Sequence, residues 1–126
     1  MPQEDKAFTE FKAQVRDNDS GLTFDKLFRI WWVLRKKQGR PSAIQSSALC
    51  KTTGLNESSL RRGIMVLRRS GFDICSGATG YFRSKDQADV LATIDHLESR
   101  AKSLMETARL LREQLGDQGV QDKLSL

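Results

Sequence analysis

The chain has 126 residues, with 21 lysines and arginines, 16 aspartates and glutamates, one histidine and two cysteines. This length suits one domain with an appendage, and 38% apolar with 29% charged residues is globular rather than disordered or fibrous. The longest uncharged apolar run, residues 30 to 34, is too short to span a membrane, and the acidic N-terminus lacks the layout of a secretory signal. We therefore expect a cytoplasmic protein (or one in the cytoplasm or nucleoid of a host cell) with two reduced core thiols, Cys50 and Cys75.

The charge is distributed unevenly along the chain. Residues 1 to 22 carry three basic and five acidic side chains, residues 23 to 85 carry thirteen and three, and residues 86 to 126 carry five and eight. The middle block thus has a net charge of +10, whereas its flanks have −2 and −3. Such a block predicts a polyanionic partner, of which nucleic acid is the first candidate, although an anionic membrane surface or an acidic protein fits the same charge.

Two helices are predicted before the middle of the chain. Residues 4 to 17 place Phe8 and Phe11 on one side, and residues 18 to 21 form a turn. The second helix, from Thr23 to about Lys37, is apolar almost all round, so we expect it at the centre of the core. Its two tryptophans could stack on bases, but core packing is the better interpretation inside such a helix.

A basic turn follows the second helix. Lys36, Lys37 and Arg40 are expected to neutralise backbone phosphates. The Gly-Arg-Pro triplet at 39 to 41 could enter a minor groove, but a helix stop followed by a turn explains it more simply.

Residues 46 to 69 predict two helices joined by a tight turn. Ser46 is placed to cap the first, and Gly54 provides the positive φ that the turn needs. Asn56 is placed to cap the second helix, whose buried stripe is formed by Leu60, Ile64 and Leu67.

This segment resembles the helix-turn-helix of bacterial and phage DNA-binding proteins. The resemblance covers about 20 residues and rests on the spacing of Cys50, Gly54, Leu55 and Leu60. Gly63 departs from the pattern, because the family usually has an aliphatic residue there. The resemblance implies that residues 56 to 70 form a recognition helix.

The other face of that helix suits a major groove. No acidic residue occurs between Ser58 and Phe72, whereas an ordinary solvated face would intersperse glutamates with arginines. Arginine forks can pair with guanine, and serines can reach a base edge or a phosphate. This face carries Ser58, Ser59, Arg61, Arg62, Met65 and Arg69.

After Gly71 the sequence changes period and predicts a β-hairpin over residues 74 to 83. A hairpin after a recognition helix resembles the wing of a winged-helix domain, and this likeness spans residues 23 to 85, with Ile44 as the accompanying edge strand. The likeness implies that Thr79 at the tip and Arg83 or Lys85 on the return strand approach DNA, whereas Tyr81 is expected in the core or sheet.

Residues 86 to 115 predict one long helix that Gly116 ends. Apolar residues recur at alternating steps of three and four from Val90, which is typical of a coiled coil. The competing interpretation packs this stripe on the chain's own first helices. The alanines allow close approach but anchor poorly, so the dimer is expected to be weak or antiparallel. The dimerisation seam is Ile94, Leu97, Ala101, Leu104, Ala108, Leu111 and Leu115.

Groups for catalysis are scarce in this sequence. His96 lies in the long helix as a solvated residue, the two cysteines stand apart, and no glycine loop precedes a Lys-Ser or Lys-Thr. We therefore expect neither an enzyme nor a metal or cofactor site.

These observations predict a mainly α protein with a small β-hairpin, a winged helix-turn-helix with a long C-terminal helix. The expected segments are an N-terminal helix and turn (1–22), a DNA-binding domain (23–85), a dimerisation helix (86–116) and a flexible tail (117–126).

The expected function is that of a dimeric transcriptional regulator on double-stranded DNA, with half-sites about 34 Å apart if the units face in parallel. The alternatives are a protein-binding module of a phage or mobile element that docks on a host protein, and a replication or partition accessory protein. The expected DNA contacts are Lys36, Lys37, Arg40, Ser46, Ser47, Lys51, Asn56, Ser58, Ser59, Arg61, Arg62, Met65, Arg69, Thr79 and Arg83.

Overall fold

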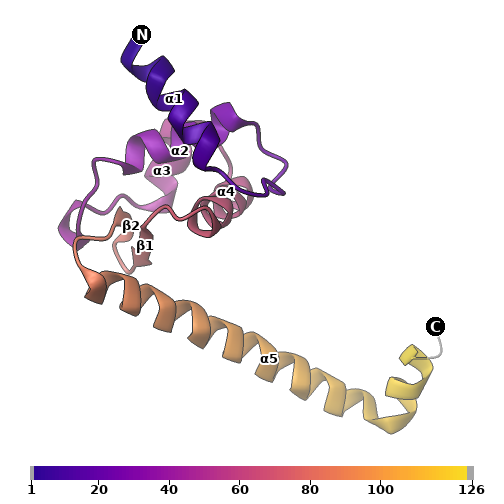
Figure 1. Ribbon diagram of the computed structural model, residues 1–126. Helices are drawn as coiled ribbons and strands as arrows, with labels where there is room; N and C mark the ends of the chain where they lie inside the picture. Colours follow the sequence, from indigo (N-terminus) through magenta and orange to yellow (C-terminus); the bar gives the residue numbers. More distant parts are fainter. Residues whose placement is uncertain (1, 125–126) are drawn as a thin grey trace. The chain divides into compact units, whose positions relative to one another are not determined.

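The computed structural model describes residues 2 to 124, with side chains described for residues 6 to 116 (Figure 1). The chain divides into two compact units, one that extends to Val90 and one that begins at Leu91. The elements, in order, are α1 (Pro2–Gln14), α2 (Phe24–Leu34), the 3-10 turn η1 (Arg40–Ser42), α3 (Ser46–Thr53), α4 (Glu57–Arg69), β1 (Ile74–Gly77), β2 (Gly80–Arg83) and α5 (Gln87–Leu124). The predicted mainly helical fold with a small hairpin and a long C-terminal helix is confirmed.

The first helix is part of the N-terminal unit and ends three residues earlier than expected. Its apolar side meets α2, because the ring centroids of Phe8 and Phe11 lie 5.1 and 5.2 Å from that of Phe28. The following turn is held by Asn18, which accepts a hydrogen bond from the Ser20 hydroxyl at 2.6 Å and donates one to the Leu22 carbonyl at 2.8 Å.

The second helix is the centre of the N-terminal unit, as its all-round apolar surface predicted. Leu27, Ile30 and Leu34 are completely buried, and the helix contacts α1, α3, α4 and β2. Thr23 caps its first turn by accepting a hydrogen bond from the backbone N–H of Lys26. The helix ends at Leu34 rather than near Lys37, because the following residues turn to pair with β2.

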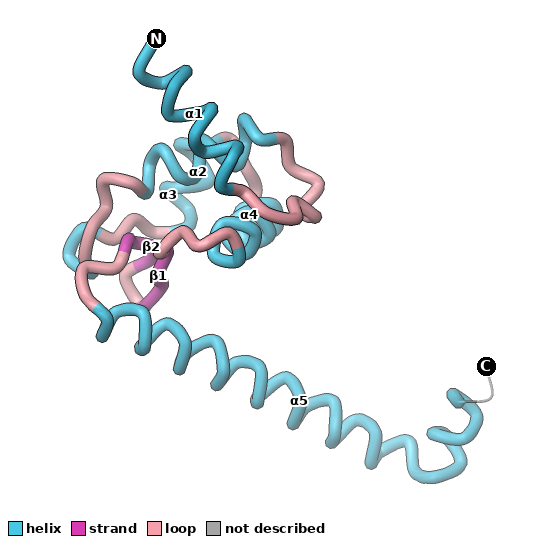
Figure 2. Tube along the Cα trace, viewed as in Figure 1, coloured by secondary structure: helices cyan, strands magenta, loops and turns pink. Residues whose placement is uncertain are grey.

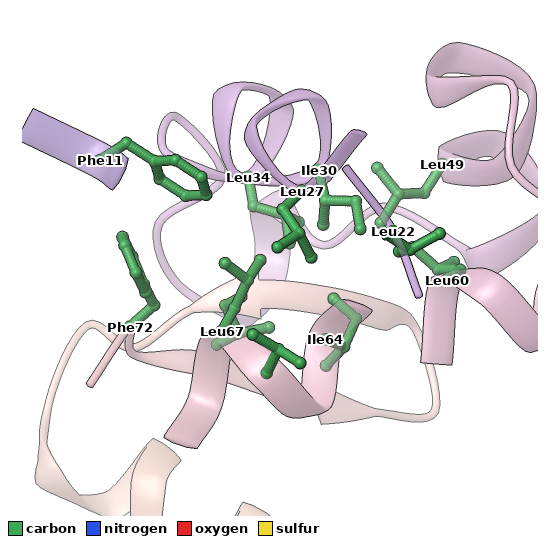
Figure 3. Packing of buried hydrophobic residues seen from close by; sticks show 12 residues of the cluster. Phe11, Leu22, Leu27, Ile30, Leu34, Leu49, Leu60, Ile64, Leu67 and Phe72 are labelled. Atoms are coloured by element: carbon green, nitrogen blue, oxygen red, sulfur yellow. The ribbon is translucent and has the colours of Figure 1, made fainter. Parts of the chain in front are cut away.

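One continuous hydrophobic core joins these helices to α3, to α4 and to Phe72 and Ile74, which follow α4 in the chain (Figure 3). Figure 3 shows Leu27, Ile30 and Leu34 of α2 facing Leu67 and Ile64 of α4. Phe72 reaches the same core from the turn that follows α4, with its ring centroid 5.3 Å from that of Phe11.

The hairpin is a two-stranded antiparallel sheet in which Ile74 pairs with Arg83 and Gly77 with Gly80. Ile44 adds a single-residue bridge to Tyr81, with hydrogen bonds of 2.9 and 2.8 Å, so the expected edge residue beside the hairpin is confirmed. Tyr81 packs against the core, as expected.

The long helix α5 continues further than the predicted end at residue 116. Figure 2 shows a bend near its C-terminal end, and the non-helical φ and ψ of Gly116 (68° and 178°) interrupt the helix at the residue where a stop was predicted. Beyond this interruption the backbone of residues 117 to 124 is again helical, and their side chains lie outside the described part.

Among the described residues, no helix combines the length and the apolar character that crossing a lipid bilayer requires.

Candidate nucleic-acid interface

The orientation of α4 is fixed at its start and along its inner side. The side chain of Asn56 accepts a hydrogen bond from the backbone N–H of Ser59 at 2.8 Å, which confirms Asn56 as the N-cap. Gly54 in the preceding turn has a φ of 76°, the left-handed conformation expected there. The residues that α4 buries are Leu60, Gly63, Ile64, Val66 and Leu67.

Gly63, the departure from the helix-turn-helix pattern, is explained by the close approach of α4 and α2. A Cβ atom at this position would lie 2.6 Å from Cδ1 of Ile30 and 3.1 Å from Cδ1 of Leu22. A larger residue at this position would therefore force the side chains of Ile30 and Leu22 to shift, and the glycine allows α4 to lie close to the central helix.

The outer face of α4 is accessible to a partner. The side chains predicted for it lie on the solvent side, and Met65 keeps 49% of its surface exposed among the arginines. Ser59 alone among them is half-buried. The exposed members are Ser58, Arg61, Arg62, Met65 and Arg69.

The positive charge of this face is scarcely reduced by the protein's own carboxylates. Arg62 donates a hydrogen bond to the neutral hydroxyl of Ser59 at 3.2 Å. Arg69 lies 3.9 Å from a carboxylate oxygen of Asp19, but 64% and 74% of these two side chains are exposed. Such an exposed pair is weak, so Arg69 remains available to a phosphate.

The start of α3 differs from the prediction. Gln45, not Ser46, is the N-cap residue, and it makes no side-chain capping hydrogen bond. The Ser46 hydroxyl instead donates to a carboxylate oxygen of Glu57 at 3.1 Å and so links the beginnings of α3 and α4. Ser47 and Lys51 are exposed on α3, where they are free to face a phosphate backbone.

Arg68 fixes the hairpin to α4, a role that the sequence analysis missed. Its Nε donates to the carbonyl of Ile74 at 2.8 Å, and its Nη2 donates to the hydroxyl of Ser76 at 3.0 Å. Burial lowers the pKa of the Arg68 guanidinium from its ordinary value. Its place one residue after the buried Leu67 is the only sequence signal of this role.

The tip of the hairpin is exposed to solvent, whereas Arg83 on its second strand makes contacts within the protein. Thr79 is exposed in the two-residue turn between the strands. The guanidinium of Arg83 pairs with Asp73 at 3.1 Å, donates to the carbonyl of Arg35 at 3.1 Å and lies 5.1 Å from the ring centroid of Trp31. Arg83 is therefore engaged within the protein, unlike the exposed arginines on the outer face of α4.

The basic turn lies beside the hairpin. The backbone of Gly39 donates to the carbonyl of Arg83 at 2.8 Å, and the guanidinium of Arg40 lies 5.8 Å from the ring centroid of Phe82. Lys36 and Arg40 are exposed and Lys37 is half-buried. The turn therefore adds cations next to the hairpin.

A separate cleft of about 670 Å³ is lined by aromatic and charged side chains from α1, α2 and the residues around β1 and β2. The guanidinium of Arg35 lies 3.4 Å from the ring centroid of Trp32 at its wall. The cations of this cleft are engaged by aromatic rings and carbonyls of the chain, in contrast to those of α4.

Within the described residues, no group of three or more histidine, cysteine, aspartate or glutamate side chains could hold a metal ion. Cys50 and Cys75 form no disulfide bond. Burial, with a smaller contribution from the charge of Glu57, raises the pKa of the Cys50 thiol.

No family model, curated protein or solved structure matches the chain.

Proposed function

We propose that this protein binds double-stranded DNA as a winged helix-turn-helix, with α4 as the recognition helix and the β1–β2 hairpin as the wing. In this proposal, the protein is a transcriptional regulator that acts as a dimer. The expectation of no enzymatic activity belongs to the same proposal.

The outer face of α4 is the single observation that carries this proposal. Its arginines are exposed on a helix whose opposite face is completely buried, and the sequence from Ser58 to Phe72 contains no carboxylate. A rigid helix with clustered guanidinium groups suits a major groove, because it presents several hydrogen-bond donors and no carboxylate from Ser58 onward.

The side chains divide into two roles under this proposal. Arg61 and Arg62, at the centre of the exposed face, reach base edges, and Arg69 reaches a base edge or a phosphate. The outer cations contact the backbone and contribute affinity without sequence preference. These phosphate contacts come from Lys36, Lys37, Arg40 and Lys51, with Thr79 at the tip of the wing.

Fluorescence anisotropy on a selected duplex and on random duplexes, over a series of salt concentrations, tests the proposal. Affinity should fall steeply with salt, since phosphate contacts release counterions. Arg62→Ala should cost about 1 to 3 kcal/mol on the selected duplex and less on random ones, whereas Lys37→Ala should weaken both alike and reduce the salt slope by about one.

Lys6→Ala is the matched control, because it removes the same charge from an exposed position on α1. It should leave both affinities unchanged. Equal losses from Arg62→Ala and Lys37→Ala on both duplexes would show that the assigned roles are wrong, and no binding of the wild-type chain at low salt would refute DNA binding.

The competing function is the occupation of an acidic site on another protein. Met65 favours it, because an exposed apolar side chain at the centre of a basic face suits a protein interface as well as a thymine methyl group. Retention on an acidic protein without retention on duplex DNA would select this alternative. A replication or partition accessory protein would use the same DNA interface, and reporter repression compared with plasmid maintenance separates these two roles.

A further inference from the structure

The apolar seam of α5 is exposed along its whole length in the C-terminal unit. Its large members keep between 40% and 67% of their surface in contact with solvent. Removing such a row from water is favourable, so a second helix that carries a matching row would stabilise it. These exposed members are Ile94, Leu97, Leu104, Leu111 and Leu115.

The position of the alanines selects the orientation of a second copy. A parallel pair places each seam residue opposite itself, so that Ala101 meets Ala101 and Ala108 meets Ala108, and these layers are underfilled. In an antiparallel pair, Ala101 lies opposite Leu111 of the second copy and Ala108 opposite Leu104. Leu97 then lies opposite Leu115. Each alanine thus meets a leucine, and the layers have similar volumes.

We propose that two copies of this chain pair antiparallel through α5, with the two-fold axis beside residue 106 and Glu98 of each copy next to Arg112 of the other. The two charged residues are exposed and flank the seam at equivalent heptad positions, one residue after Leu97 and Leu111. In an antiparallel pair, such positions face each other across the two helices.

Charge, rather than burial, fixes the register. A shift by one heptad adds Ile94 to the seam and places Leu115 opposite Val90, which is exposed near the start of α5, so burial does not select the proposed register. The shifted register sets Glu98 against Met105 and Arg112 against Leu91. The proposed register brings Met105 next to its own counterpart and forms two interchain ion pairs.

Among the described side chains, two carboxylates lie on the C-terminal half of α5 near Arg112, and both are paired with another residue. Arg109 is engaged within its own helix, where it pairs with Glu106 at 2.6 Å and with Glu113 at 2.5 Å. Glu98 of the second copy is the complementary charge that the register supplies.

The arrangement has a consequence that rests on the proposed function. At 1.5 Å per residue, the two copies of Leu91 lie about 45 Å apart along the paired helices. The DNA-binding units are then attached at opposite ends of the pair.

Sedimentation equilibrium of the full chain tests the charge pairing without DNA. Glu98→Arg and Arg112→Glu should each weaken dimerisation about tenfold, because each creates two like-charge contacts. The double variant should recover most of the wild-type association. Failure of the double variant to recover, or a wild-type chain that remains monomeric at every accessible concentration, would overturn the proposal.

Cross-linking with a short bismaleimide tests the orientation independently, in a Cys50→Ala background because Cys75 is buried. Met105→Cys should link the two copies, whereas Leu97→Cys should not, since its two copies lie about 27 Å apart in this register. A link through position 97 would show a parallel pair, and no link at either position would exclude the register. Because neither measurement involves DNA, a chain that gives the expected links and ignores DNA refutes the proposed function alone.

Discussion

The helices α2 and α5 both carry rows of large apolar side chains, yet the two rows differ in their surroundings. Leu27, Ile30 and Leu34 of α2 are completely buried, whereas Leu104 of α5 keeps 67% of its surface exposed. The residues around α2 come from four other elements of its unit. The number of apolar residues in a helix thus indicates how much surface is favourably buried, but not whether the same chain buries it.

The distribution of the apolar residues distinguishes the two cases. An all-round apolar surface, as on α2, requires neighbours on several sides, and only the core of a unit offers them. A narrow a/d stripe, as on α5, requires one helical neighbour, and a second copy can supply it. The variants that follow are ordered from the largest expected effect to the smallest.

Leu27→Ala should give the largest loss of stability. It leaves a cavity at the centre of the N-terminal unit and should lower the free energy of unfolding by about 2 to 5 kcal/mol. Urea unfolding followed by the fluorescence of Trp31 and Trp32 in α2 measures this unit. Leu104→Ala is the matched control on α5 and should change the same transition by less than about 0.5 kcal/mol. Equal losses would mean that the α5 stripe also supports the core.

Gly63→Ala tests the close contact between α4 and α2. The added Cβ would overlap Cδ1 of Ile30, so we expect a loss of about 1 to 3 kcal/mol in the same unfolding assay. Ile30→Val removes that methyl group, and the double variant should therefore lose less than the sum of the single changes. Additive losses would show that the two helices are not in contact at this point.

Arg68→Met tests the attachment of the hairpin to the recognition helix. It leaves the carbonyl of Ile74 without its side-chain donor and should cost about 1 to 2 kcal/mol. Amide exchange in β1 and β2 should accelerate. Arg61→Met, on the exposed face of the same helix, should leave both stability and exchange unchanged, and a similar loss in the two variants would contradict the distinction.

Asp19→Asn should have the smallest effect. The pair with Arg69 is exposed at 3.9 Å, so stability should change by less than about 0.5 kcal/mol. Removing the carboxylate also removes a competitor for the guanidinium, and DNA affinity should rise slightly rather than fall. Glu10→Gln removes a charge from α1 and serves as the control. Weaker DNA binding by the Asp19 variant alone would mean that this pair positions Arg69 for DNA.

Much of the fold could be predicted from local pattern. The cap Asn56, the left-handed Gly54 and the buried stripe of α4 follow from side-chain chemistry and helical period, and each was found where it was expected. These features depend on a few neighbouring residues, so sequence is sufficient for them.

Contacts between distant segments could not be predicted in this way. Ser46 pairs with Glu57 rather than capping α3, and Arg83 pairs with Asp73 and lies over the ring of Trp31. Arg68 resembles its neighbour Arg69 in the sequence, but one holds the hairpin and the other is exposed. Which of several equivalent cations is free depends on acceptors that folding brings near.

The sequence by itself determined where the helices and the hairpin form, and which block of the chain carries the positive charge. Those properties arise from periodicity, capping and composition, which act over a few residues. The tertiary structure decided that a Cβ atom at position 63 would overlap Ile30, that Arg68 and Arg83 make contacts within the protein, and that Arg61, Arg62 and Arg69 are exposed. Only packing assigns each side chain its neighbours, and the neighbours determine whether a charge stabilises the fold or is available to a partner.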